Sequence, residues 1–131
     1  VARSHDRSER DYVLDLMLAH DGVDLEYDEC IGVGYDEVHA DPEAALATIV
    51  ERFKNVERQC DAVVIVGSDY TDVSSPTELS FNARIAANLG APVVLAVKAK
   101  DRRPEQVAQI VDVCLTEIRT QPRTPQRRAT Q

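Results

Sequence analysis

Residues 60–97, which read CDAVVIVGSDYTDVSSPTELSFNARIAANLGAPVVLAV, decide the fold. Two apolar runs, 61–66 and 92–97, bracket a stretch with helical spacing that opens near Pro76 and stops at Gly90. Runs of valine and isoleucine without polar alternation are typical of strands covered on both faces, as in a parallel sheet. The stretch therefore predicts one β-loop-α-β unit of a doubly wound α/β fold, with the two runs as neighbouring parallel strands.

The loop after the first run is where we expect a functional site, because open parallel sheets bind ligands beyond the carboxyl ends of their strands. Its polar residues are clustered, and the candidates are Gly67, Ser68, Asp69, Tyr70 and Thr71. We expect these residues to contact a ligand or a neighbouring domain. The alternative is structural: Ser68 and Asp69 only close the turn, while Tyr70 covers the sheet edge.

Residues 60–100 resemble the amino-terminal domain of bacterial phosphate acetyltransferase in its long form, a domain that is itself similar to dethiobiotin synthetase. Matching pieces occur upstream in the same order, as RDYVL at 10–14, DLEYD at 24–28 and VHADP at 38–42. The resemblance covers residues 1–119. It implies a partial doubly wound parallel sheet of the P-loop type, with helices on both faces.

The resemblance also implies a reaction for a parent protein, the reversible transfer of an acetyl group between coenzyme A and phosphate. In that family the catalytic domain is the carboxyl-terminal one, and the amino-terminal domain is regulatory and helps to assemble the oligomer. The resemblance thus implies no catalytic residue, metal or cofactor here, with acetyl-CoA and phosphate as substrates of the parent. The implied partners are the carboxyl-terminal transacetylase domain, further copies in a homo-oligomer and a small-molecule effector.

The phosphate-binding pattern GxxxxGK[ST] does not occur in the chain, and no glycine precedes Gly22. On the resemblance, residues 1–6 lie just past the second strand of the parent domain. We therefore expect a fragment of a larger protein that neither makes acetyl phosphate nor hydrolyses ATP by itself.

Two other functions are alternatives to this reading. An ATP-dependent ligase of the dethiobiotin synthetase type carries a Val-Glu-Gly motif whose glutamate helps to hold magnesium. The triplet here is Ile65-Val66-Gly67, and a valine cannot coordinate a hard cation. Asp69 offers a substitute carboxylate, but it equally suits a turn. The second alternative is an interaction module without a ligand on the same scaffold.

The composition describes an acidic chain of one domain. The 131 residues are 44% hydrophobic and carry a net charge of −8, which argues against binding to nucleic acid or anionic membranes. No apolar stretch approaches the roughly 20 residues that span a bilayer, and no signal-peptide pattern opens the sequence, so we expect a cytoplasmic protein. Cys30, Cys60 and Cys114 lack the spacing of a disulfide framework or a zinc site and are expected to be thiols.

Four helices are expected, with starts at Ser8, Asp41-Pro42, Ser75-Pro76 and Pro104. The first should end near Asp21-Gly22. Residues 23–40 are acidic and predict a connecting segment with one short strand near Ile31; a calcium loop is the alternative, but the EF-hand spacing is missing. Residues 120–131 predict a disordered tail or linker.

Helical spacing assigns an inward face to each of the last three helices. The expected inward residues are Leu46, Ile49, Val50, Phe53 and Val56 in the second, Leu79, Ile85, Ala86 and Leu89 in the third, and Val107, Ile110, Val111, Cys114, Leu115 and Ile118 in the last.

Overall fold

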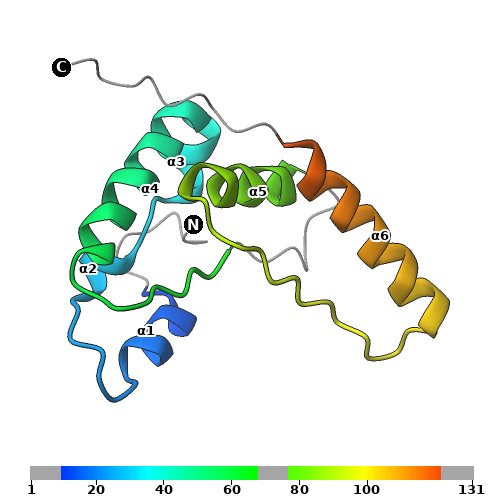
Figure 1. Cartoon of the computed structure of the whole chain (residues 1–131), viewed down its shortest axis with the longest axis horizontal. Helices are drawn as coiled ribbons and strands as arrows, with labels where there is room; N and C mark the ends of the chain where they lie inside the picture. The colour runs from blue at the N-terminus through cyan, green and yellow to red at the C-terminus, as the bar shows by residue number, and fades with distance from the viewer. Residues whose placement is uncertain (1–9, 68–76, 122–131) are drawn as a thin grey trace. The chain divides into compact units, whose positions relative to one another are not determined.

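A computed structural model describes residues 10–67 and 77–121 of the chain. The chain divides into two compact units, residues 1–68 and 69–131. In the first unit the helices are α1 (Tyr12–Leu18), α2 (Tyr27–Cys30), α3 (Tyr35–Ala40) and α4 (Pro42–Glu57). In the second unit they are α5 (Thr77–Leu89) and α6 (Pro104–Thr120), as Figure 1 shows.

The core of the first unit lies along α4, which contacts both α2 and α3. Pro42 stands in the first turn of α4, where its missing N–H costs nothing, and the Asp41 carboxylate accepts hydrogen bonds from the Glu43 and Ala44 N–H groups at 3.1 and 3.0 Å. The helix start predicted from Asp41-Pro42 is confirmed. Three of the five predicted inward residues are buried, together with Ala45 and the loop residue Val33; the three are Leu46, Ile49 and Val56.

The first helix begins later than predicted. Asp11, not Ser8, caps α1: one oxygen of its carboxylate accepts hydrogen bonds from the N–H groups of Val13 and Leu14 at 2.9 and 3.0 Å. Ser8 lies outside the described residues. The predicted stop is confirmed, because α1 ends at Leu18 and Gly22 adopts a left-handed φ of 90° that suits glycine.

The prediction of a connecting segment with a strand near Ile31 is wrong in the described structure, where two short helices, α2 and α3, occupy most of residues 27–40. At the start of each helix, the backbone N–H of the residue just before the helix donates a hydrogen bond to an acidic side chain three residues later in the sequence. Glu29 Oε2 accepts from the Glu26 N–H at 3.0 Å, and Glu37 Oε2 accepts from the Gly34 N–H at 2.7 Å. These two carboxylates therefore act as helix-start acceptors rather than as solvated loop charges.

The second unit is built on the contact between α5 and α6. α6 starts where the sequence predicts, with Pro104 in its first turn. The predicted start of α5 at Ser75-Pro76 lies outside the described residues, and the chain is helical from Thr77 on. Ile85 of the predicted α5 stripe is buried, and Phe81 and Ala83 are buried as well. The six predicted inward residues of α6 are all half-buried. Ser80 of α5 donates a hydrogen bond to Glu117 of α6, and Gln121 Nε2 donates to the same carboxylate at 2.8 Å.

The predicted pair of parallel strands is not formed in the described residues. Runs 61–66 and 92–97 are irregular, and Gly34 is the one residue of ranges 10–67 and 77–121 that carries a β-bridge. A strand is assigned only where a neighbouring segment supplies hydrogen bonds to it. The expected cover on both faces is absent too, because Val64 is 76% exposed and Val94 is 93% exposed. Residues 122–131, predicted as a disordered tail, lie outside the described part.

Candidate functional site

The predicted site loop is described only at its first residue. Gly67 is exposed at the end of the apolar run 61–66. Ser68, Asp69, Tyr70 and Thr71 lie outside the described residues, so their contact with a ligand or a domain stays a prediction. No catalytic or metal residue was predicted elsewhere in the chain.

Glu78, in the first turn of α5, is the first described acidic residue after this loop. Its Oε2 atom is buried and has no hydrogen-bond partner among the described residues. A carboxylate near a helix start interacts favourably with the positive end of the helix dipole, but an unsatisfied buried oxygen is unfavourable. Ser75, at the predicted start of this helix, lies outside the described residues.

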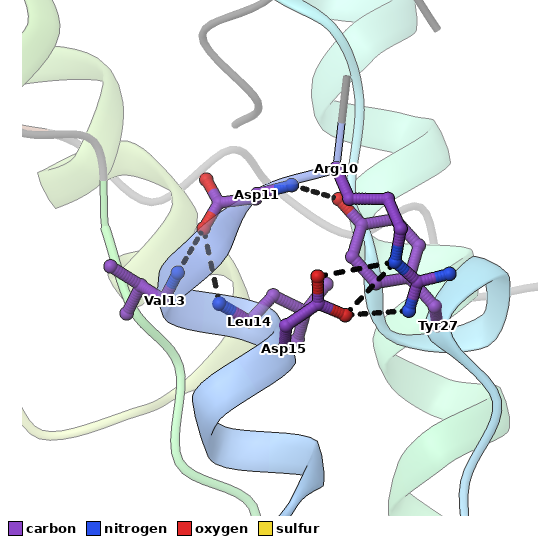
Figure 2. A network of polar contacts seen from close by, with 6 residues as sticks. All are labelled: Arg10, Asp11, Val13, Leu14, Asp15 and Tyr27. Carbon is purple, nitrogen blue, oxygen red and sulfur yellow. Dashed lines mark hydrogen bonds and ion pairs between the residues drawn. The ribbon is translucent and has the colours of Figure 1, made fainter. Parts of the chain in front are cut away.

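The first unit carries a polar network around the start of α1, drawn in Figure 2. The backbone N–H of Asp11 donates a hydrogen bond to the Tyr27 hydroxyl at 2.6 Å, while the Asp11 carboxylate caps α1. One residue thus orders the start of α1 through its side chain and joins it to α2 through its backbone. The network accounts for contact between these two helices, which are separated in sequence by an acidic turn.

Arg10 completes this network. Its Nε lies 3.0 and 3.1 Å from the two Asp15 carboxylate oxygens, and its Nη2 lies 2.5 Å from one of them (Figure 2). The centre of its guanidinium lies 4.1 Å from the centroid of the Tyr27 ring, a cation–π geometry. The hydrogen bond from Arg10 holds the pKa of Asp15 below its usual value.

The role of this network is structural, because its polar groups already have partners within the chain. The Arg10 guanidinium is already shared between the Asp15 carboxylate and the Tyr27 ring, and Asp11 already accepts two N–H groups. Sequence reasoning did not find the network, because Tyr27 is sixteen residues from Asp11 and no local pattern links a phenol to a distant N–H. Arg10 and Asp11 lie in the piece RDYVL and Tyr27 lies in DLEYD, the two pieces that resemble the family, and Asp15 directly follows the first of them.

The three cysteines are free thiols and half-buried. Burial raises the pKa of Cys30, and the nearby Glu29 and Cys60 raise it further. A raised pKa keeps the thiol protonated at neutral pH, and the protonated form is a poor nucleophile. The raised pKa of Cys30 therefore disfavours this thiol as a nucleophile.

Within the described ranges, no three His, Cys, Asp or Glu side chains gather as they would around a metal ion. The acidic residues that suggested a calcium loop are distributed over α2, α3 and their flanks instead. None of the helices described is both long and apolar enough to cross a membrane.

Comparison with known proteins relates the chain to one family. The family model described as an AAA domain matches residues 7–120. A phosphate acetyltransferase of Nitratidesulfovibrio vulgaris is 26% identical over 103 residues, a match that covers 75% of this chain and 15% of the relative. No solved structure matches the chain.

These matches confirm the resemblance to phosphate acetyltransferase. The family match also supports the predicted α/β class, while the described residues supply its helices and not its sheet. The chain spans only 15% of the length of the relative.

Proposed function

Since the chain belongs to the AAA domain family, which matches residues 7–120, we propose that it serves as the regulatory and assembly domain of a phosphate acetyltransferase. The observation that carries the proposal is the identity of 26% over 103 residues with the phosphate acetyltransferase of N. vulgaris. Because that match involves only 15% of the relative, the proposal concerns one part of a larger enzyme.

In the proposed parent, the thioester bond of acetyl-CoA breaks and the acetyl carbon forms a bond with a phosphate oxygen, giving acetyl phosphate and coenzyme A. We assign no residue of this chain to that transfer, and both substrates bind the carboxyl-terminal catalytic domain. The chain acts through its contacts with that domain, with further copies in a homo-oligomer and with a small-molecule effector.

A cytoplasmic location, without nucleic acid or membrane as a partner, belongs to the same proposal. The net charge of −8 supports it, because nucleic acid and anionic membranes attract basic surfaces.

Exposed apolar side chains support an assembly role. On α1, Tyr12 is 75% exposed and Leu16 is 61% exposed, one turn apart on the same helix face. In the two apolar runs, Val64 of 61–66 is 76% exposed and Val94 of 92–97 is 93% exposed. Burial of such side chains is favourable by about 1.5–3 kcal/mol each, so contacts with other parts of a larger protein would stabilise the chain.

The loop from Gly67 to Thr71 is the segment we propose for contact with the effector or with a neighbouring domain. The support is positional, because the loop follows an apolar run at the point where open α/β folds bind ligands. Replacing Asp69 and Tyr70 with alanine in the full-length parent should change the effector response of acetyl transfer or the oligomeric mass measured by light scattering. The melting temperature should change little.

Asp21→Ala is the matched control, since it removes an exposed carboxylate outside the loop. A double variant that unfolds would favour the alternative in which the loop residues only close a turn. A double variant that matches the wild type in effector response and in mass would contradict the proposed contact. Nucleotide binding to the full-length protein that drives a ligase reaction would favour the dethiobiotin synthetase alternative.

A further inference from the structure

The segment that leads into α6, whose place in the chain Figure 1 shows, is rich in cations although the chain as a whole is acidic. Four of the six residues from 98 to 103 are cationic, and every residue of this segment is exposed. We call it the basic turn; its cations are Lys98, Lys100, Arg102 and Arg103, and its one acid is Asp101. The basic turn thus carries a net charge of +3 in a chain whose net charge is −8.

The backbone of the basic turn has a defined shape. The Arg102 N–H donates to the Ala99 carbonyl at 3.2 Å, and Arg102 Nη1 donates to the Lys98 carbonyl at 2.7 Å. Asp101 sits at the bend with φ of 63°, the one non-glycine residue with positive φ in the described ranges. These contacts fold the segment back on itself into a turn.

Among the described residues, the cations of the basic turn have no acidic partner. In the described part, none of the four makes an ion pair, whereas Arg10 pairs with Asp15 and Lys54 pairs with Glu57 at 2.9 Å. The acids nearest in sequence are Asp101 in the turn and Glu105 in the first turn of α6, and neither forms an ion pair with another described residue. Clustered like charges repel one another, so this arrangement favours a bound anion.

We infer that the basic turn binds the phosphate groups of a small anionic ligand. Phosphate suits this set of donors, because arginine presents a planar fork to two of its oxygens and lysine adds a compact charge. A long nucleic acid fits less well, since the rest of the chain is acidic and would repel it. The inference deepens the proposed regulatory role and rests on it for the choice of coenzyme A as a probe.

The test titrates the 131-residue chain with coenzyme A and, separately, with inorganic phosphate, by calorimetry at low salt. The test variant combines Lys98→Ala, Lys100→Ala and Arg103→Ala. The control variant combines Lys54→Ala, Arg58→Ala and Arg119→Ala, which removes the same charge from exposed positions elsewhere. Amide chemical shifts of the wild-type chain locate the bound ligand independently of any variant.

We expect the Kd for the probe to rise at least about tenfold in the test variant and less than about threefold in the control variant. The amide chemical shifts that change when the probe binds should belong mainly to residues 98–103. Binding of coenzyme A alone would identify a phosphate-bearing cofactor, and equal binding of both probes would identify free phosphate.

Three outcomes would overturn the inference. These are equal weakening in the two variants, shift changes centred elsewhere, and no binding of either probe. A preference for a single-stranded oligonucleotide would also overturn it, because the turn would then belong to a nucleic-acid surface. Binding at the turn that leaves acetyl transfer by the parent unchanged would keep the site and reject the regulatory role.

Discussion

Tyr27 shows how one residue organises the first unit. Its hydroxyl accepts the Asp11 N–H at 2.6 Å, and its ring lies beneath the Arg10 guanidinium. The phenol thus contacts both residues that begin the α1 region, while Tyr27 itself begins α2. The contact explains why RDYVL and DLEYD, two pieces that resemble the family, meet in the folded chain.

The Arg10–Asp15 pair predicts a pH effect whose direction is fixed by its geometry. The hydrogen bond from Arg10 lowers the pKa of Asp15 in the folded chain relative to the unfolded one. The pair therefore adds stability above the unfolded pKa of Asp15, and that contribution is lost as the pH falls through the folded pKa. Because both side chains are exposed, the contribution is small.

Arg10→Gln should return the pKa of Asp15 to its ordinary range, as followed by an NMR titration of its carboxyl carbon. Arg58→Gln is the control, because it removes the same charge from another exposed position. An unchanged Asp15 pKa in Arg10→Gln, or an equal rise in both variants, would show that the ion pair is not formed in solution.

The elements differ in how well local sequence predicts them. The starts of α4 and α6 follow from Asp-Pro and from a proline ahead of a helical apolar pattern, and both are where the sequence puts them. The starts of α2 and α3 are stabilised by equally local hydrogen bonds to Glu29 and Glu37. The sequence prediction instead treated these two residues as charges of an acidic loop. Their helix-start role could have been found from the three-residue spacing.

The predicted strands and the polar network depend on contacts between distant residues. A run such as 61–66 has strand composition, yet it becomes a strand only when another segment supplies its hydrogen bonds. The Asp11–Tyr27 bond likewise needs the folded arrangement of α1 and α2. Of the predicted site, the described residues include only Gly67, so the candidate loop remains a sequence prediction.

At the element scale, the α4 cap gives a direct stability test. Asp41→Ala removes the acceptor of the Glu43 and Ala44 N–H groups and should lower the free energy of unfolding by about 1 kcal/mol in chemical denaturation. Asp41→Asn is the matched control, because asparagine keeps an acceptor at the cap and should lose far less. Equal losses in the two variants would contradict the role of the Asp41 oxygen.

The chain forms two compact units. Apolar side chains are exposed on α1 and in both apolar runs, 61–66 and 92–97. Its family match covers residues 7–120, and its match to a phosphate acetyltransferase covers 15% of that relative. The exposed apolar segments, and a match that covers only a small part of the relative, are both consistent with the proposal that the chain works as part of a larger enzyme. In that proposal the chain contributes contacts and regulation, and the chemistry belongs to another domain.

The most direct measurement is acetyl-phosphate formation from acetyl-CoA and phosphate, assayed in the proposed full-length parent and in the 131-residue chain alone. We expect the parent to form acetyl phosphate and to release coenzyme A in equal amounts, and the chain alone to show no turnover above background. A parent that does not transfer acetyl groups would contradict the assignment to phosphate acetyltransferase. Turnover by the chain alone that survives repurification, and that is lost on mutating one of its residues, would contradict its non-catalytic role.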